Sequence, residues 1–359
     1  MEAGLAICDA STARLLSQVQ RAFPLDARPF AALGEALGLP EEQLLARISE
    51  LKAQRIIRQI SGIFDSRRLG YQSCLVAAQV PSRILEQAAA AINRHPGVSH
   101  NYERAHAFNL WFTLTVPGHA DLPAEAARLR MEAGAVQVRL LPTVRTFKIG
   151  VILDVGGNQG AGPTPPATAA ASPSEYAASA SAKSLSAREI AAVRALQKDL
   201  PLVARPFHAL ANEAGMAEEE LLAHARQFLE GGEMRRFAAV LFHRRAGFTA
   251  NGMVVWNVPA ERVVAVGQRF AAYPAVSHCY QRPCYPDWPY SLFTMIHARS
   301  QEECERLVRE MANAVDIHEH AILYSLREFK KTRVRYFEES LPEQPPQETR
   351  CRPQADAPS

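Results

Sequence analysis

The sequence contains two copies of one unit. Three pairs of matching segments mark the repeat: Ala27–Phe30 and Ala204–Phe207, Arg67–Tyr71 and Arg244–Phe248, and Val98–His100 and Val276–His278. In the last pair, a tyrosine and an arginine follow the histidine at alternate positions in both copies. A nearly constant offset at this many positions indicates a tandem fusion. The length of 359 residues agrees, because it exceeds what one compact core usually holds.

A segment of biased composition separates the two copies. Residues 156–182 are almost entirely Gly, Ala, Pro, Ser, Thr, Asn and Gln, so this stretch cannot bury enough apolar surface to fold. We predict these parts of the chain: a winged helix-turn-helix over 1–70, a ferredoxin-like domain over 71–155, a flexible linker over 156–184, a second winged helix-turn-helix over 185–245, a second ferredoxin-like domain over 246–337, and a disordered tail over 338–359.

The elements of each copy follow from its periodicity. Apolar residues at helical spacing predict helices over 10–22, 28–37 and 41–53, and in the second copy near 186–198, 205–214 and 218–230. Ser61-Gly62 is the predicted turn of a β-wing between strands 56–60 and 63–64. Beyond Gly70 the pattern predicts strand, helix, two strands, helix and strand over 74–80, 82–93, 98–104, 108–116, 122–131 and 136–149. The order βαββαβ is ferredoxin-like, so we expect an α+β fold in two tandem copies.

Charge and cysteine content exclude several classes of protein. The chain has 40 Lys and Arg against 37 Asp and Glu, a net charge of +3, which argues against a strongly basic nucleic-acid binder. The helix that would read DNA in the second copy begins with 218–220, three glutamates that would repel phosphates. The six cysteines form no C-x-x-C pair, and we interpret Cys279 and Cys284 as ordinary thiols. With no signal peptide and no apolar window of about 20 residues, we expect a reducing, cytoplasmic setting.

Functional residue types concentrate on the predicted hairpin over 98–113. Alternation along the first strand puts His100, Tyr102 and Arg104 on one face, with Asn101 on the other face and His106 at the turn. Such a face makes a poor core, because its polar groups need partners. Either a ligand occupies this face, or another subunit covers it with polar pairs.

The second copy keeps His278, Tyr280 and Arg282 in the same alternation, but its hairpin turn is longer. Three prolines stiffen that turn, which carries several aromatic residues, among them Trp288. Two alternatives stay open for the turn. It is either a flat aromatic surface for a large planar ligand or a hydrophobic plug that packs on the other copy.

A winged helix-turn-helix followed by βαββαβ resembles the Lrp/AsnC transcriptional regulators. The hairpin motifs, His100–His106 with 109–113 and His278–Arg282 with 285–290, resemble more specifically those of the siroheme decarboxylases, which are Lrp-like enzymes. The resemblance covers roughly 10–150 and 185–330, and the copies look like D-type and L-type subunits joined in one chain. Gln59 departs from it, because many relatives have a second arginine there, which implies a weaker carboxylate clamp at this position.

The resemblance implies a carboxy-lyase that removes carbon dioxide from two acetate side chains of siroheme. The product would be 12,18-didecarboxysiroheme, for the heme d1 or the alternative heme pathway. A conjugated macrocycle can accept the electrons left on carbon, so neither an oxidant nor an added cofactor is expected. The protein must then deliver a proton near neutral pH, which suits histidine. We expect His100 and His106 to do this, with Tyr102 and Arg104 orienting the departing carboxylate.

Further residues are expected to bind this substrate. Its faces need aromatic contacts and its rim needs arginines, because a guanidinium binds a carboxylate bidentately. The expected substrate-binding residues are Arg58, Asn101, Trp111, Arg145, Arg235, Arg236, His278, Tyr280, Arg282 and Trp288. No metal site is expected from the protein alone, and His278 is a candidate axial ligand to the iron of the substrate.

The expected partners follow from the same resemblance. Siroheme is the ligand, and the two copies pair through their sheets as a pseudo-dimer, within one chain or by exchange in a homo-oligomer. Further siroheme-decarboxylase-type subunits stay open, whereas DNA and membranes are not expected. Two other functions stay open as well: a DNA-binding Lrp/AsnC-type regulator and a non-catalytic tetrapyrrole sensor. The sequence alone does not say which copy holds the productive site.

Overall fold

The structure, a computed structural model, describes residues 10–21, 23–149, 184–242 and 250–338. Of the predicted linker and tail, only Ser184 and Glu338 lie among these residues. Each copy begins with three helices: α1 (Ala10–Arg21), α2 (Pro29–Leu37) and α3 (Glu41–Ala53), and then α7 (Ala187–Leu196), α8 (Pro206–Glu213) and α9 (Glu218–Gly231). All of them begin and end within two residues of the predicted bounds.

Local signals explain where these helices begin and end. Pro29 occupies the first turn of α2, where a missing N–H costs nothing. Gly38 ends the same helix with a φ of 72°, in the left-handed region that favours glycine. At α7, Ser186 and Glu189 form a reciprocal capping box. The helices of both copies then pack into one shared apolar core, which includes Leu16, Phe30, Phe207 and Phe228.

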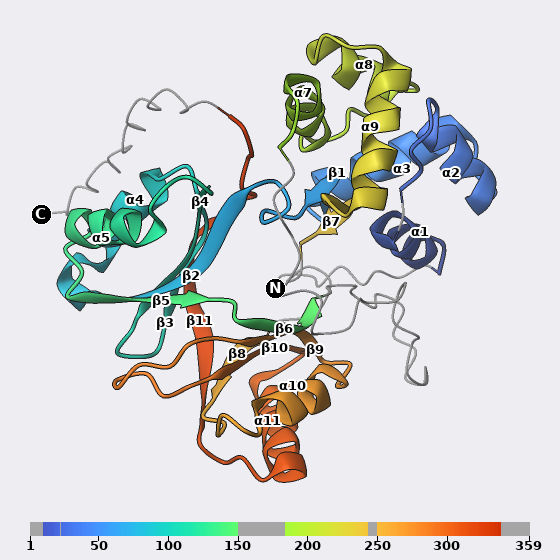
Figure 1. Ribbon diagram of the computed structural model, residues 1–359. Helices are drawn as coiled ribbons and strands as arrows, with labels where there is room; N and C mark the ends of the chain where they lie inside the picture. Colours follow the sequence, from blue (N-terminus) through green and yellow to red (C-terminus); the bar gives the residue numbers. More distant parts are fainter. Residues whose placement is uncertain (1–9, 22, 150–183, 243–249, 339–359) are drawn as a thin grey trace, which may run out of the picture.

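The predicted β-wing hairpin at Ser61-Gly62 is wrong. Residues 57–64 form one continuous strand, β1 (Ile57–Phe64), which pairs antiparallel with β7 (Met234–Leu241) of the other copy. Gly62 allows close packing here, because an added Cβ would lie 2.8 Å from Met234 Sδ. The two helix-turn-helix units therefore share a sheet as well as a core, and they form one body at the upper right of Figure 1.

The rest of each copy has the predicted βαββαβ order. The first comprises β2 (Tyr71–Gln79), α4 (Leu85–Arg94) after a short 3-10 turn, β3 (Val98–Arg104), β4 (Leu110–Pro117), α5 (Leu122–Glu132) and β5 (Gln137–Pro142). The second comprises β8 (Ala250–Trp256), α10 (Val263–Ala271), β9 (Val276–Gln281), β10 (Leu292–Ala298), α11 (Gln301–Val315) and β11 (His320–Lys331). The strand orders β5-β2-β4-β3 and β11-β8-β10-β9 are equivalent, which confirms the ferredoxin-like architecture in both copies.

The last strand of each copy crosses to the other copy. The predicted single strand over 136–149 divides after Pro142: β5 pairs with β2 of its own copy, and β6 (Arg145–Ile149) pairs with β9 of the second copy. In return, β11 pairs with β8 over 320–324 and with β3 of the first copy over 325–331. Both histidine-bearing strands, β3 and β9, therefore receive a strand from the opposite copy.

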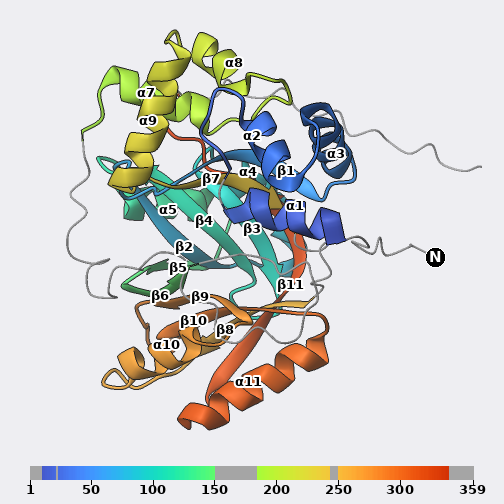
Figure 2. The ribbon, with the colours of Figure 1, turned by 90° about the vertical axis from the view of Figure 1, so that its right-hand side faces the viewer.

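The two sheets also pack on each other through their inner faces. A core of residues from both copies fills this interface, including Ala77, Trp111, Leu141, Val255, Trp288, Phe293 and Leu323. Helices α4 and α5 cover the outer side of the first copy, and α10 and α11 cover the outer side of the second (Figures 1 and 2). The copies thus form the expected pseudo-dimer within one chain.

Candidate functional site

Strand β3 presents His100 and Tyr102 on the inner face of the first sheet. Their rings stack with centroids 6.2 Å apart and planes at 29°. Ser99 Oγ lies 2.9 Å from His100 Nδ1, within hydrogen-bond distance. On β4, Thr113 lies opposite His100 and Trp111 lies opposite Tyr102. This face is therefore apolar toward Trp111 and polar at its His100 end.

Asn101 points to the opposite face of the sheet. Its Nδ2 donates to Asn93 Oδ1 at 3.0 Å and to Ala89 O at 3.4 Å, and both partners belong to α4. The side chain is fully buried. The structure therefore places Asn101 behind the sheet, where it ties β3 to α4, and away from the face that carries His100.

Chain segments from both copies meet at the His100 end of β3. Arg58 Nη2, on β1, donates to Lys331 O at 2.6 Å. Thr332 N donates to Ser99 O at 2.7 Å. Because Lys331 lies opposite His100 in the ladder, these bonds bring Arg58 and the end of β11 beside the histidine.

Arg58, Arg236 and Arg333 form a cluster at this place, which we call the arginine cluster. Arg333 Nη1 donates to Ser61 Oγ and Gly62 O, both at 3.2 Å. Burial lowers the pKa of Arg333 to about 10, and the charges of Arg58 and Arg236 lower it further. Like charges held this close destabilise one another unless an anion joins them. The arginine cluster is therefore suited to bind carboxylates.

Arg104 and Arg282 take equivalent places in the two copies. Arg104 Nη1 donates to Leu323 O at 2.5 Å, and Arg282 Nη1 donates to Leu141 O. Burial lowers the pKa of each arginine to about 10. Each arginine binds the last strand of the opposite copy, so the alternative of a face covered by a paired unit holds for Arg104. Within the described ranges, the Nε of each arginine has no hydrogen-bond partner.

His106 lies past the other end of β3. Four strand residues separate His100 from Arg104, about 13 Å at the usual rise, and His106 lies beyond them. His106 Nδ1 accepts a hydrogen bond from Phe108 N at 3.0 Å, and burial lowers the pKa of His106. The structure does not bring the two histidines of the first copy together.

The proline-rich turn of the second copy packs into the first copy. Trp288 is fully buried, with its ring centroid 5.2 Å from those of His106 and Trp111. Asp287 beside it accepts a hydrogen bond from Arg139 Nη2 of β5 at 2.8 Å. Of the two alternatives for this turn, the hydrophobic plug holds. Trp111 and Trp288 lie in the core between the copies and not on a surface open to a planar ligand.

Strand β9 repeats the arrangement of β3 with different neighbours. His278 and Tyr280 lie on one face, with ring centroids 5.9 Å apart. Met295 of β10 and Ile149 of β6 lie opposite His278 in the ladder. The immediate neighbours of this histidine across the ladder are therefore apolar.

The arginines expected around His278 have other contacts. Arg235 Nη2 and Nε donate to Asp65 Oδ2 at 2.8 and 3.2 Å. Burial alone would raise the pKa of Asp65, but the charge and hydrogen bonds of Arg235 hold that pKa below its usual value. Arg145 lies opposite Gln281 and so shares a face with it, whereas Tyr280 faces the other way. Arg235 is thus engaged by a carboxylate of the protein itself.

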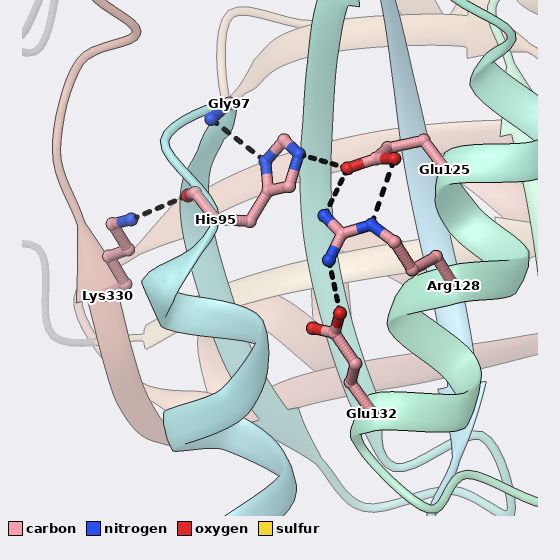
Figure 3. Close-up of polar contacts among 6 residues, drawn as sticks. All are labelled: His95, Gly97, Glu125, Arg128, Glu132 and Lys330. Carbon is pink, nitrogen blue, oxygen red and sulfur yellow. Dashed lines mark hydrogen bonds and ion pairs between the residues drawn. The ribbon is translucent and has the colours of Figure 1, made fainter. Parts of the chain in front are cut away.

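A polar network lies behind the start of β3 (Figure 3). His95 Nδ1 accepts from Gly97 N at 3.0 Å, so its Nε2 carries the proton toward Glu125 Oε1 at 2.7 Å. Burial lowers the pKa of His95, and this effect outweighs the opposing effect of Glu125. Lys330 Nζ donates to His95 O at 3.3 Å. The network fixes β11 and α5 to the segment that leads into His100.

Lys331 and Arg333 belong to this site although sequence analysis did not select them. Both belong to the second copy by sequence, yet they lie at His100 of the first copy. Only the strand exchange explains this placement. The available signal was a difference between the repeats, because Lys330-Lys331 ends β11 whereas Lys148-Ile149 ends β6.

Other features of the described residues lie apart from this site. A cavity of about 440 Å³ opens at the start of β2 and is lined by Arg67, Tyr71, Gln72, Ser73, Cys74, Leu122, Pro123, Leu140 and Pro142, none of which was a predicted site residue. Within the described ranges, His, Cys, Asp and Glu form no group of three or more that could hold a metal ion. Among the helices described, none is long and apolar enough to cross a membrane.

Comparison with known families assigns both kinds of domain. The AsnC-like ligand binding domain matches residues 68–148 and 245–330, and the siroheme decarboxylase NirDL-like HTH domain matches residues 12–58 and 189–235. The chain is therefore a tandem protein of the AsnC-like class with helix-turn-helix units of the NirDL type.

Individual relatives narrow this class. The siroheme decarboxylase of Hydrogenobacter thermophilus is 41% identical over 329 residues, covering 91% of this chain and 95% of the relative. The siroheme decarboxylase NirDL subunit of Paracoccus denitrificans is 36% identical over 321 residues, covering 89% and 94%. The crystal structure of the siroheme decarboxylase NirDL in complex with an iron-uroporphyrin III analogue matches with a TM-score of 0.71 at 35% identity, covering 92% and 95%. The chain belongs to the siroheme decarboxylase family, in its fused NirDL form.

Proposed function

We propose that this protein decarboxylates siroheme at a site in its first copy, between His100 and the arginine cluster. The observation that carries this proposal is their juxtaposition: a group able to deliver a proton stands beside a surface suited to carboxylates. The names of the relatives and the iron-uroporphyrin III analogue bound by one of them support a carboxylate-bearing tetrapyrrole as the substrate.

Substrate binding uses the two kinds of surface that β3 and its neighbours offer. The arginine cluster, Arg58, Arg236 and Arg333, binds carboxylates at the rim of the macrocycle. The stacked rings of His100 and Tyr102 lie against its face. Arg104 Nε, which the interface between the copies leaves unused among the described groups, orients the departing carboxylate.

The chemical step is a decarboxylation without net oxidation. The bond between the acetate methylene carbon and its carboxylate breaks, carbon dioxide leaves, and the electron pair moves into the conjugated macrocycle. His100 then donates a proton to the methylene carbon, which becomes a methyl group, and His100 regains a proton from solvent. Because electrons and protons balance, no oxidant and no added organic cofactor is required.

The second copy has a supporting role in this proposal. It supplies β11 and Arg333 to the site and the Trp288 plug to the interface, while His278 remains a candidate axial ligand to the substrate iron. The expected product is 12,18-didecarboxysiroheme, and we favour the heme d1 pathway for it. We place the reaction in the cytoplasm, because Cys74, Cys279 and Cys304 are buried free thiols.

The test is to incubate the purified chain with siroheme without oxygen and to follow the mass of the tetrapyrrole. Loss of two carboxyl groups is the expected result. An absorbance change without a change in mass would instead identify a tetrapyrrole sensor. Specific retention on DNA at physiological salt, with neither effect, would identify a regulator.

A further inference from the structure

Strand β11 carries two ionisable side chains onto the face of His100. Lys331 lies opposite His100 and Glu328 lies opposite Tyr102, and directly opposed residues of neighbouring strands point to the same face. The intervening Lys330 points to the other face, where its Nζ donates to Asn93 O at 2.7 Å. The alternation of contacts along β11 therefore supports the position of Lys331 beside His100.

The surroundings of Lys331 suit an exchangeable cation. Its Nζ lies 3.9 Å from Glu328 Oε2, and the two side chains are 29% and 38% exposed. An ion pair this long and this accessible to water stabilises little, so another carboxylate can compete for the ammonium. The backbone is more firmly held, because Arg58 Nη2 donates to Lys331 O.

The equivalent position in the second copy is apolar. Lys148 of β6 donates to Tyr273 O at 2.9 Å, near the end of α10, just as Lys330 donates to carbonyls near the end of α4. This match aligns the residue after each lysine, so Ile149 stands opposite His278 where Lys331 stands opposite His100. The side of the ladder that differs is the one that faces the histidine.

We propose that Lys331 is a specificity-determining residue that anchors an acetate carboxylate of the substrate beside His100. This inference rests on the proposed function and deepens it. The anchored acetate is held where His100 can deliver its proton, and Ile149 deprives the second copy of the same anchor. The first site thus depends on a cation that the opposite copy provides.

The test compares two iron porphyrins that differ only in their acetates. Iron-uroporphyrin III has acetate and propionate side chains, whereas iron-coproporphyrin III has methyl groups in place of the acetates. We expect Lys331→Ile in the full chain to weaken iron-uroporphyrin III binding about tenfold in an absorbance titration, and to leave iron-coproporphyrin III binding within about twofold. Lys331→Arg should restore most of the affinity for iron-uroporphyrin III.

A matched control and two outcomes separate this proposal from the function itself. Lys198→Ile removes another lysine paired with a glutamate, at 2.6 Å from Glu213, and should change neither affinity. If Lys331→Ile binds iron-uroporphyrin III like the wild type, or loses both porphyrins equally, the anchor is overturned even if siroheme turnover persists. If the acetate-specific loss appears but the wild type never releases carbon dioxide, the anchor stands and the decarboxylase function fails.

Discussion

The two histidine hairpins share one design and differ in what surrounds it. In both copies a serine contacts the histidine Nδ1 at 2.9 Å, and a tyrosine ring follows two residues later. His100 faces Thr113 and Lys331 across the ladder, whereas His278 faces Met295 and Ile149. Duplication kept the scaffold, and the neighbours of each histidine diverged toward a polar site in one copy and an apolar one in the other.

The carboxylate-binding residues diverged in the same direction. Arg58 and its repeat equivalent Arg235 occupy matching positions on β1 and β7. Arg235 is paired with Asp65, whereas the described contact of Arg58 is the carbonyl of Lys331. A carboxylate of the protein competes with substrate at Arg235, so we assign substrate binding to the Arg58 side.

The largest expected effect is on turnover. His100→Ala should lower the rate of carbon dioxide release by about 10²–10⁴-fold, the usual contribution of a proton-transfer group. The absorbance shift on siroheme binding should remain. His278→Ala should keep the rate within about tenfold of the wild type, since we assign no proton transfer to it. Similar losses in both variants would mean that the two hairpins act together.

His106→Ala tests the separation along β3. Since His106 lies beyond the far end of the strand and packs on Trp288, its replacement should lower turnover less than that of His100. The measurement is the same anaerobic assay, with thermal unfolding recorded in parallel. A loss as large as that of His100→Ala in a stably folded variant would place both histidines in the chemistry.

Replacing the plug should weaken folding rather than chemistry. Trp288→Ala should lower the free energy of unfolding by about 3–5 kcal/mol, the usual effect of removing a fully buried tryptophan. Asp287→Ala, which removes an exposed partner of Arg139 from the same turn, should have a smaller effect. Denaturant unfolding measures both. A stable Trp288→Ala variant that had lost only tetrapyrrole binding would return the turn to a ligand-binding role.

Arginine replacements sharpen the comparison in binding. Arg58→Ala should weaken the affinity for iron-uroporphyrin III by about tenfold, since it removes a charged hydrogen-bond donor from the site. Arg235→Ala should change that affinity by less than about threefold, because Arg235 is already engaged by Asp65. Titrations at low and high salt measure both, and the reverse order of effects would move the substrate to the second copy.

The smallest expected effect is a pH dependence of stability from His95. Burial holds the pKa of His95 below its usual value near 6.5, so the unfolded chain takes up this proton at a higher pH than the folded chain. Its contribution to stability is present above that pH and is lost as the pH falls toward the folded pKa. His95→Gln should therefore flatten the fall in melting temperature below about pH 6.5, and His106 should account for part of the remaining slope.

Sequence periodicity predicted the elements better than their pairing. Helix bounds and the βαββαβ order came from local patterns, so the repeat alone was enough to find them. The wing hairpin at Gly62 and the single strand over 136–149 were wrong, because in both places the chain pairs with the other copy. Register between distant segments leaves no local signal. The same limit hid Lys331 and Arg333, and left open whether Trp288 met a ligand or a core.

The most direct test of the account is a crystal structure of this chain with iron-uroporphyrin III. We predict that the porphyrin lies beside His100, with its carboxylates on Arg58, Lys331 and Arg333. A porphyrin bound only beside His278, with Arg235 released from Asp65 to meet it, would contradict the assignment of the productive site to the first copy.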